Sequence, residues 1–344
     1  MDFNVITTPA QFHALAKEWN ELLAESAVHA PFLRHEYLSG WWQTLGGGEW
    51  PQGDLCIVTA RREGQLVGVA PLFLTQNRDQ LPALMLVGSI EISDFLDVIA
   101  RPPDLADFLD GMCAYLKALA APAWRVLDWY NVLSDSPTLP ALQAAAERQG
   151  WKFVLEPYLP APNIPLHGDW EKYLAEQVEK KQRHEIRRKM RRVEESSDAI
   201  HWYIVQDSAS LEAEVEAFLA LMEQDPDKAR FLTPPMRAGF HSIARAAFDN
   251  GWLQLAFMTV NGEKACGYFN FDYDNRIWVY NSGIDFRFRE YSPGWVLLGY
   301  LLQWANQEKR SAYDFMRGDE EYKYRFGAVN RHVMRVRVFR EGVS

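Results

Sequence analysis

Two stretches of similar pattern decide the fold: LCIVTARREGQLVGVAPLFL (residues 55–74) and LQLAFMTVNGEKACGYFNF (residues 253–271). Each contains two apolar runs joined by a short polar connection with a glycine, Glu63-Gly64 in the first and Asn261-Gly262 in the second. This pattern predicts a β-hairpin. Because the two hairpins start 198 residues apart and match in pattern, we expect two copies of one structural unit.

Segments of helical and strand-like pattern surround each hairpin in the same order. The strands WRVLDWY (124–130) and RSAYDFM (310–316) match in the two halves, each with an aspartate near its end. The Pro-rich stretch PYLPAPNIP (157–165) is typical of a linker. We therefore expect an α/β (α+β) protein of two tandem units with mixed, mostly antiparallel sheets, at residues 1–160 and 161–344. The other expected elements are helices from Thr8-Pro9 onward and within 35–45, 105–119, 138–149, 169–195, 209–223, 234–249 and 294–308, and strands within 83–90, 95–100, 151–157, 201–206, 276–284 and 332–339.

The composition excludes several classes of protein. The 344 residues are 48% hydrophobic and 24% charged, which is typical of globular domains and excludes general disorder. Three widely separated cysteines, Cys56, Cys113 and Cys266, indicate a reduced, cytoplasmic protein. The N-terminal residues lack the basic and apolar parts of a signal peptide, and the uncharged stretch 291–307 contains too many polar residues for a membrane span.

Charge is distributed unevenly along the chain. Residues 1–160 carry 10 Lys and Arg against 19 Asp and Glu, whereas residues 161–344 carry 26 against 27. Within the second half, EKKQRHEIRRKMRR (179–192) has eight basic and two acidic residues. Helical spacing gives this segment one narrow apolar stripe and a basic remainder, which is either a solvated face or a binding face for an anion. The overall acidity argues against general DNA binding.

The turn Ser292-Pro293-Gly294 opens an apolar helix that continues with Trp295. Serine suits the cap of a helix and proline its first turn. The free N–H groups of a helix N-terminus favour a phosphate, and Arg289 precedes the turn by three residues. The alternative is a plain cap of a buried helix. In the first half the corresponding stretch, Arg101-Pro102-Pro103-Asp104, has no glycine, so we expect only the second unit to bind a ligand at this turn.

The order of elements in each half resembles the GNAT acyltransferase fold, and two copies in one chain resemble the Fem-type aminoacyltransferases. More specifically, the chain resembles the acetyltransferase-like proteins linked to bacterial cellulose biosynthesis (the CelD/BcsL-like branch). This resemblance implies transfer of an acetyl or other acyl group from acyl-CoA to an amine, with no permanently bound cofactor. The matching pieces are LVGVAPLFL (66–74), SDFLDVIA (93–100), KKQRHEIRRKMRR (180–192), Ser292-Pro293-Gly294 and DFMRGDEEYKYRFG (314–327).

The resemblance also implies which residues bind the donor. The turn with Arg289 is similar to the Arg/Gln-x-x-Gly-x-Gly/Ala turn that holds the coenzyme A pyrophosphate. Here Ser292 replaces the first glycine, and Pro293 contributes no N–H. Basic side chains of the 180–192 segment are further candidates for the phosphates. The expected donor-binding residues are Arg289, Ser292, Gly294, Trp295, Lys181, Arg183 and Arg187.

The motif DFMRGDEEYKYRFG supplies the candidate catalytic residues. Lys323 lies in an aromatic-Lys-x-x-Phe-Gly sequence, and in the Fem family such a lysine is associated with stabilising the tetrahedral intermediate. Tyr322 can donate a proton to a leaving thiolate, and Arg317 can hold an oxyanion. Asp314 or Glu321 can accept the proton of the amine. The alternative for all of them is a salt-bridged surface helix.

Two other functions remain open. One is an aminoacyl-tRNA-dependent peptidyltransferase of the Fem type, although the helices within 169–195 look too short for the tRNA-binding insertion of that family. The other is a non-catalytic accessory protein that binds a glycan or a partner. Histidines and cysteines show no metal-ligand spacing, so no metal site is expected. We expect the acceptor amine to lie between the two copies; the acceptor, the acyl group and the oligomeric state do not follow from the residues.

Overall fold

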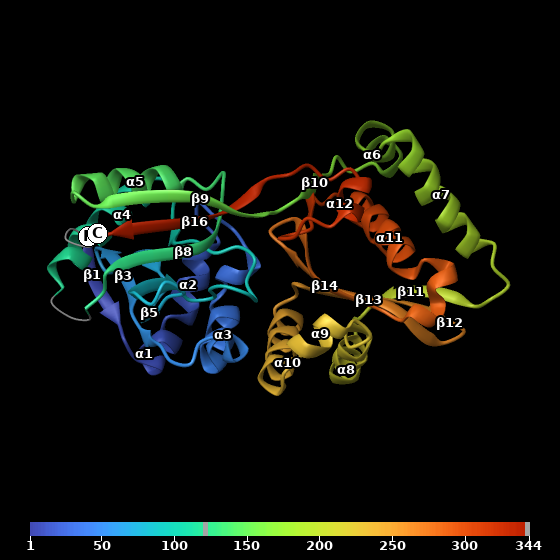
Figure 1. The fold of residues 1–344 in the computed structure, drawn as a ribbon, viewed down its shortest axis with the longest axis horizontal. Coiled ribbons are helices and arrows are strands. Elements are labelled where there is room, and N and C mark those ends of the chain that lie inside the picture. The colour runs from blue at the N-terminus through green and yellow to red at the C-terminus, as the bar shows by residue number, and fades with distance from the viewer. Residues whose placement is uncertain (120–122, 341–344) are drawn as a thin grey trace. The chain divides into compact units, whose positions relative to one another are not determined.

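The computed structural model describes residues 1–119 and 123–340 and divides into two compact units (Figure 1). The first unit comprises residues 1–159 and the chain from His332 onward, and the second comprises residues 160–331. The predicted class, a mixed α/β protein with mostly antiparallel sheets, is confirmed in both units.

The second unit is a six-stranded sheet with helices on both faces. Its elements are β10 (Asn163–Pro165), α6 (Trp170–Gln177), α7 (Lys180–Glu194), β11 (Ile200–Ile204), α8 (Leu211–Met222), α9 (Pro226–Phe231), α10 (Pro234–Asp249), β12 (Leu253–Val260), β13 (Glu263–Tyr273), β14 (Arg276–Ile284), the 3-10 helix η2 (Phe286–Tyr291), α11 (Pro293–Gln307), β15 (Ala312–Asp314) and α12 (Glu321–Arg325). The strand order is β10-β15-β14-β13-β12-β11. The helix α11 covers one face with α6 and α7 beside it, and α8 to α10 cover the other (Figure 1).

The predicted hairpin of this unit is confirmed. Strands β12 and β13 pair antiparallel on either side of Asn261-Gly262. Both turn residues have positive φ, 49° and 85°, which asparagine and glycine adopt more readily than other residues. The turn closes the hairpin, and a bulge beyond it, between Met258 and Thr259, shifts the register of the two strands by one residue.

One strand pair in this sheet separates along its length. Strands β14 and β15 run parallel and pair only from Arg276↔Ala312 to Trp278↔Asp314, whereas β14 continues to Ile284. An extra residue, Tyr280, bulges from β14 opposite β13, because Asn270 pairs with Val279 and Phe269 with Asn281. Bulges bend a strand, so one edge of β14 opens beyond Trp278. The helix α11 begins beside this open end.

The first unit contains two sheets. Its elements are β1 (Asp2–Ile6), α1 (Pro9–Ala14), α2 (Ala16–Leu23), the 3-10 helix η1 (Pro31–Leu33), α3 (His35–Gly48), β2 (Asp54–Leu55), β3 (Ile57–Arg62), β4 (Gln65–Ala70), β5 (Leu72–Gln76), β6 (Pro82–Leu86), β7 (Ile99–Ala100), α4 (Leu105–Ala118), β8 (Val126–Leu133), α5 (Thr138–Arg148), β9 (Lys152–Pro160) and β16 (His332–Phe339). The sheet orders are β1-β3-β4-β7 and β2-β5-β6-β8-β16-β9. The predicted hairpin at Glu63-Gly64 is confirmed by the antiparallel pairing of β3 with β4.

The last strand does not lie where the sequence placed it. The predicted second unit extended to residue 344, but β16 pairs antiparallel with β8, from Val333↔Leu133 to Phe339↔Val126, inside the sheet of the first unit. Its buried valines reach the core of the first unit in this register. The strand pattern at 332–339 was therefore correct, but its assignment to the second unit differs from the structure.

The segment 93–100 also differs from its expected strand, because only Ile99–Ala100 pairs in a sheet. Side-chain bonds replace the missing strand pairing: Asn131 donates its Nδ2 to the Ser93 carbonyl at 2.7 Å. Asp97 is 1% exposed and accepts from Ser136 Oγ at 2.6 Å. Burial raises the pKa of Asp97 to about 6, although its hydrogen bonds partly oppose the shift.

Asp97 is expected to make stability depend on pH. The folded state keeps this proton to a higher pH than the unfolded state, so the free energy of unfolding falls as the pH rises from about 4 to about 6, by about 3 kcal/mol. Asp97→Asn cannot ionise, so the stability difference, variant minus wild type, should grow by about this amount over that range. Urea denaturation at pH 4, 5, 6 and 7 measures it.

A matched variant sharpens this test. Ser136→Ala removes a hydrogen bond that lowers the pKa of Asp97, so the fall of stability with pH should become larger and should continue to a higher pH. Parallel stability curves for wild type and Asp97→Asn would contradict the assignment of this pH dependence to Asp97.

Candidate functional site

A cavity of about 310 Å³ lies at the N-terminus of α11, beside the open end of β14. Its wall is mainly aromatic and aliphatic, with a few polar groups, as is common for sites that bind small molecules. It is lined by Tyr268, Ser282, Ile284, Phe286, Arg289, Ser292, Pro293, Gly294, Trp295, Leu298, Tyr322 and Phe326.

Five residues singled out in the sequence meet at this cavity. They come from two motifs, the turn before α11 and the helix α12. Neither motif alone reveals the cavity. The N-terminus of α11 and the helix α12 line the same cavity only because β14 and β15 diverge. The predicted residues in its wall are Arg289, Ser292, Gly294, Trp295 and Tyr322.

The end of α11 presents backbone donors rather than a closed cap. Ser292 has φ 52° and ψ 52°, a left-handed conformation in which glycine is normally favoured. Its hydroxyl accepts a hydrogen bond from Lys189 Nζ at 3.1 Å and caps no amide among the described residues. Pro293 has no N–H, so the N–H groups of Gly294 and Trp295 are the first-turn donors. This end of the helix is therefore suited to an anion.

Two cations flank the helix end. Arg289 lines the cavity, is exposed, and forms no ion pair with any described residue. Lys189 lies 4.8 Å from the ring centre of Trp295 as well as beside Ser292. Lys189 was not predicted from the sequence, although a signal was present. Residue 189 lies three after Ile186 and four before Val193, both buried, so α7 turns it toward α11.

Tyr322 is the residue of α12 that reaches the cavity. Its hydroxyl has no hydrogen-bond partner among the residues that the structure describes. Burial raises the pKa of this hydroxyl, so it keeps its proton at neutral pH. Phe326 packs against Trp295, with ring centres 4.7 Å apart, and holds α12 against the start of α11. Tyr322 is therefore available as a hydrogen-bond donor to a bound molecule.

Lys323 and Asp314 lie outside the cavity wall. Lys323 is 3% exposed, and its Nζ donates to the carbonyls of Phe315, Arg317 and Gly318 at 3.2, 2.9 and 3.3 Å. It also forms an ion pair with Glu320 at 2.8 Å. In this arrangement the ammonium holds the loop after β15.

Asp314 is 1% exposed and forms an ion pair with Arg331. Burial raises the pKa of its carboxyl, and the Arg331 guanidinium opposes that shift. Its other oxygen accepts the Met316 N–H at 2.9 Å. Asp314 therefore holds the backbone after β15 and is not exposed to the cavity.

Arg317 is half-buried and does not line the cavity. Its backbone carbonyl accepts a hydrogen bond from Lys323 Nζ.

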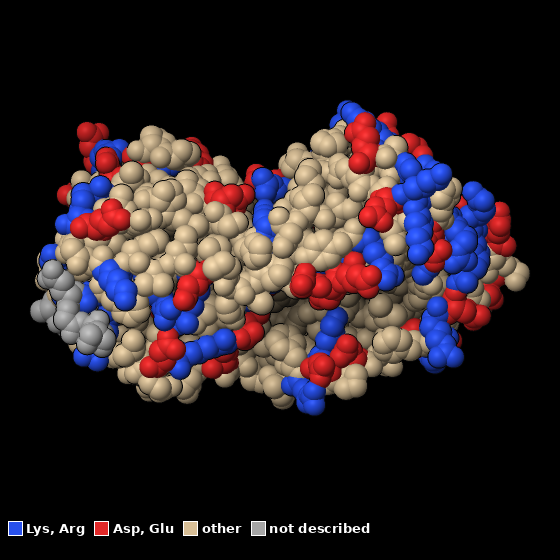
Figure 2. All heavy atoms as spheres, turned by 45° about the horizontal axis from the view of Figure 1, so that its top comes forward, with Lys and Arg blue, Asp and Glu red and all other residues tan. Residues whose placement is uncertain are grey.

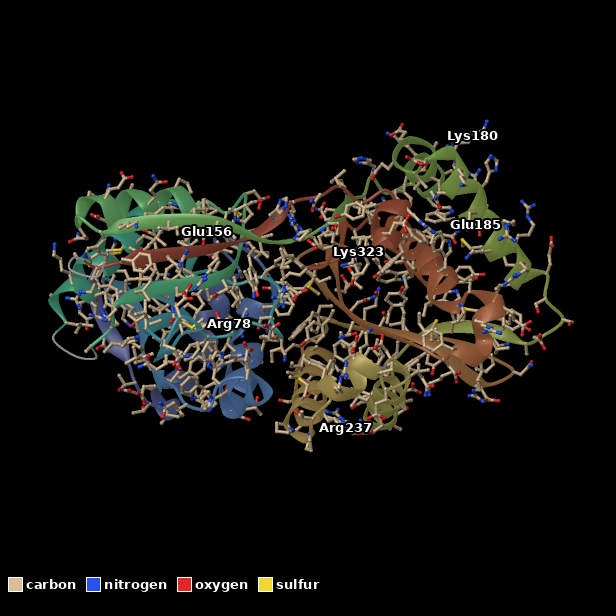
Figure 3. The ribbon with its side chains drawn as sticks, viewed as in Figure 1. Arg78, Glu156, Lys180, Glu185, Arg237 and Lys323 are labelled. Carbon is tan, nitrogen blue, oxygen red and sulfur yellow. The ribbon has the colours of Figure 1, made fainter. Side chains whose placement is uncertain are left out.

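The basic residues predicted on α7 do not line the cavity either. Lys181 is exposed, Arg183 is half-buried, and Arg187 forms an ion pair with Glu171. Figure 2 shows Lys and Arg gathered at the right, the side that carries α7, with acidic side chains among them. Figure 3 shows Lys180 and Glu185 along α7, well apart from Lys323.

Other kinds of site find little support. Across residues 1–119 and 123–340, no three His, Cys, Asp or Glu side chains are arranged to hold a metal ion. No helix in the same residues combines the length and apolar character needed to cross a membrane. Cys56, Cys113 and Cys266 are buried thiols, and burial raises the pKa of each.

Comparisons with known proteins agree with the geometry of the second unit. The family model "Acetyltransferase (GNAT) domain" matches residues 180–324, from α7 to α12. No curated protein sequence matches the chain. The match shows that most of the second unit is similar to a GNAT acetyltransferase domain.

Solved structures of similar fold match nearly the whole chain. FemX has a TM-score of 0.65 and 12% identity over 98% of this chain and 97% of its own. A conserved protein of unknown function from Bacteroides thetaiotaomicron VPI-5482 has a TM-score of 0.58 and 13% identity over 98% of this chain and 99% of its own. The L-PGS of Bacillus licheniformis has a TM-score of 0.56 and 12% identity over 98% of this chain and 93% of its own. Together with the domain match, these structures confirm the predicted GNAT- and Fem-like fold; the narrower resemblance to the cellulose-linked branch stays a prediction.

Proposed function

We propose that the chain is an N-acyltransferase whose second unit binds acetyl-CoA or another acyl-CoA. The observation that carries this proposal is the cavity at the N-terminus of α11, which joins an anion-binding helix end to the open edge of β14. The match of residues 180–324 to the GNAT domain supports it. The acceptor in this proposal is an amine, and the resemblance to cellulose-linked proteins points to a cell-envelope or exopolysaccharide amine.

The residues of the cavity fit the parts of a coenzyme A thioester. The first-turn N–H groups of Gly294 and Trp295, with Arg289 and Lys189 beside them, suit a diphosphate. The apolar wall formed by residues such as Ile284 suits the pantetheine arm. Ser282 and Tyr322 lie in the same wall and supply the polar groups that the thioester needs.

The proposed chemistry is direct attack of a neutral amine on the thioester carbonyl. The nitrogen forms a bond to the carbonyl carbon, the tetrahedral intermediate collapses, and the C–S bond breaks to release the thiolate. Tyr322 donates a hydrogen bond to the sulfur as its negative charge develops. Asp314 is committed to Arg331, so we do not assign it the role of base; the amine loses its proton to solvent or to the thiolate.

Binding of coenzyme A tests this proposal. Acetyl-CoA should bind the wild-type protein in calorimetry and raise its melting temperature. Arg289→Ala and Lys189→Met should each weaken binding by about tenfold, because each removes one charge-assisted contact to the diphosphate. Lys172→Met is the matched control, since Lys172 is an exposed residue of α6 outside the cavity. Absence of acetyl-CoA binding to the wild type would contradict the proposal.

An aminoacyl-tRNA donor is the second candidate, and the basic face of α7 favours it. Lys180, Lys181, Arg183, Arg191 and Arg192 form no ion pair with any described residue. A tRNA on this face would release many counterions, so its affinity would fall steeply with salt concentration. Binding of unfractionated tRNA at 50 mM salt that disappears at 200 mM, in a protein that does not bind acetyl-CoA, would favour this candidate.

A further inference from the structure

The open edge of β14 carries backbone groups that β15 does not reach. Pairing with β15 ends at Trp278↔Asp314, and pairing with β13 uses the opposite edge of β14. Backbone N–H and C=O groups away from water need other partners. Ser282, four residues beyond the last pair and part of the cavity wall, is the position where those partners are found.

Two side chains satisfy the backbone of Ser282. Lys228 of α9 donates its Nζ to the Ser282 carbonyl. The Ser282 N–H donates to Oδ1 of Asn281 at 2.9 Å, and Lys228 Nζ donates to the same Oδ1 at 3.0 Å. The amide oxygen of Asn281 is thus held by one backbone N–H and one ammonium. Two donors converging on one sp² oxygen at such distances are the arrangement of an oxyanion hole.

The surroundings of Lys228 strengthen its electrostatic effect. The side chain is half-buried, and burial lowers the pKa of its ammonium, while the carboxylates of Asp225 and Glu320 oppose this shift. A cation in a partly desolvated place interacts more strongly with a developing negative charge than one in water. Neither Lys228 nor the six-residue helix that carries it was predicted from the sequence.

We propose that Lys228 Nζ and the Ser282 N–H form the oxyanion hole for acyl transfer, and that Asn281 Oδ1 holds this hole until the thioester oxygen replaces it. The proposal rests on the proposed function of the cavity. When the amine nitrogen attacks, the C–N bond forms and the carbonyl π electrons move to the oxygen held by these donors. When the intermediate collapses, those electrons re-form the C=O bond, the C–S bond breaks, and the thiolate leaves with its electron pair.

Lys323 takes a different role in this arrangement. Its ammonium already contacts three backbone carbonyls and Glu320, more acceptors than it has N–H groups. Lys323 is therefore a positioning residue that holds the loop after β15. Lys228 contributes the cationic donor that the family resemblance assigned to Lys323.

Infrared spectroscopy of bound acetyl-CoA, labelled with carbon-13 at the thioester carbonyl, tests this assignment without knowledge of the acceptor. In the wild type the carbonyl stretch should move to lower frequency on binding, because two donors polarise the bond. Lys228→Met should lose most of this shift, and Lys228→Arg should keep it. Lys323→Met should keep the shift, and so should the control Lys172→Met. Asn281→Ala should bind acetyl-CoA more tightly, because the resident oxygen no longer competes.

Kinetics give a second measurement. With hydroxylamine as the amine probe and acetyl-CoA as donor, Lys228→Met should lower kcat by about a hundredfold or more. The Kd of acetyl-CoA for Lys228→Met should stay within about threefold of the wild-type value. The melting temperature of Lys228→Met should match that of Lys228→Arg. A purely structural role for Lys228 would lower stability and binding together and would leave the carbonyl frequency of bound donor unchanged.

The outcomes separate the two proposals. An unshifted carbonyl in the wild type, or the wild-type shift in Lys228→Met, overturns the assignment of Lys228 while acetyl-CoA binding still supports the proposed function. If Lys323→Met loses the carbonyl shift and Lys228→Met keeps it, the oxyanion donor is Lys323 and not Lys228. Failure of the wild type to bind acetyl-CoA overturns the proposed function, and the assignment of Lys228 with it.

Discussion

Removal of residues 332–344 is expected to unfold the first unit. The strand β16 lies between β8 and β9 in a six-stranded sheet, so its loss leaves one edge of β8 unpaired and separates β9 from the sheet. It also removes four buried side chains, which together contribute about 6–12 kcal/mol at about 1.5–3 kcal/mol each. That amount is comparable with the whole stability of a typical domain. The four side chains are Val333, Met334, Val336 and Val338.

An ion pair adds to this effect. Asp128 is fully buried, and Arg335 of β16 donates to both of its oxygens, at 2.9 and 2.8 Å. Without β16 this carboxylate loses its charged partner inside the sheet, which is strongly destabilising. Limited proteolysis with mass spectrometry should show rapid cleavage within residues 1–159 of the truncated chain. Addition of a synthetic peptide of residues 330–340 should restore protection.

A matched control separates loss of strand pairing from loss of an exposed side chain. His332→Ala changes an exposed side chain at the first position of β16 and should leave proteolysis at the wild-type rate. A truncated chain whose first unit stays resistant to protease would show that the sheet does not depend on β16.

Arg331→Leu is expected to lower the free energy of unfolding of the second unit by about 3–5 kcal/mol. Asp314 is buried and would be left without its cationic partner, and removal of one member of a buried pair has this cost. Arg331 also donates its Nε to the Ala161 carbonyl at 3.3 Å, a contact that the leucine cannot make. Denaturation in urea, followed by intrinsic fluorescence, measures the change.

Two further variants identify the buried charge as the cause. Asp314→Asn combined with Arg331→Leu should recover much of the loss, because no unpaired carboxylate remains. Arg325→Ala breaks the exposed pair with Glu321 and should cost less than about 1 kcal/mol. Equal losses from Arg331→Leu and Arg325→Ala would show that burial of Asp314 does not matter.

Local patterns were predictable from the sequence. Asn261-Gly262 formed its turn, and the helix start at Thr8 was confirmed because Thr8 Oγ1 accepts the Gln11 N–H at 3.3 Å. Such features depend on neighbours a few residues away. The partner of a strand is set by distant residues, so β16 carried a clear strand pattern without revealing its sheet. Likewise, the side chain of Asn131, more than 30 residues away in the sequence, holds the backbone at Ser93.

The candidate site was predictable in its parts but not in its assembly. Arg289 and Gly294 were found because a helix N-terminus has a chemical signature in sequence, and they do line the cavity. Lys323 carried the most specific motif, yet its ammonium faces backbone carbonyls. Lys228 lies in no recognisable sequence motif. Its proposed role depends on the bulge in β14 and on the separation of β14 from β15, about 50 residues later in the chain. Charges near a site acquire roles from three-dimensional contacts, which spacing along the sequence does not contain.

The position of β16 sets the order in which the protein can become complete during synthesis. All residues of the second unit, 160–331, leave the ribosome before the strand that the first unit requires. At the usual rates of translation, the first unit waits about 10–30 s after β9 emerges for β16 to follow. During that time β8 and β9 expose unpaired edges, which are natural targets for chaperones and for mispairing with another nascent chain. The unit encoded second is thus complete before the first, which closes only when β16 has been made.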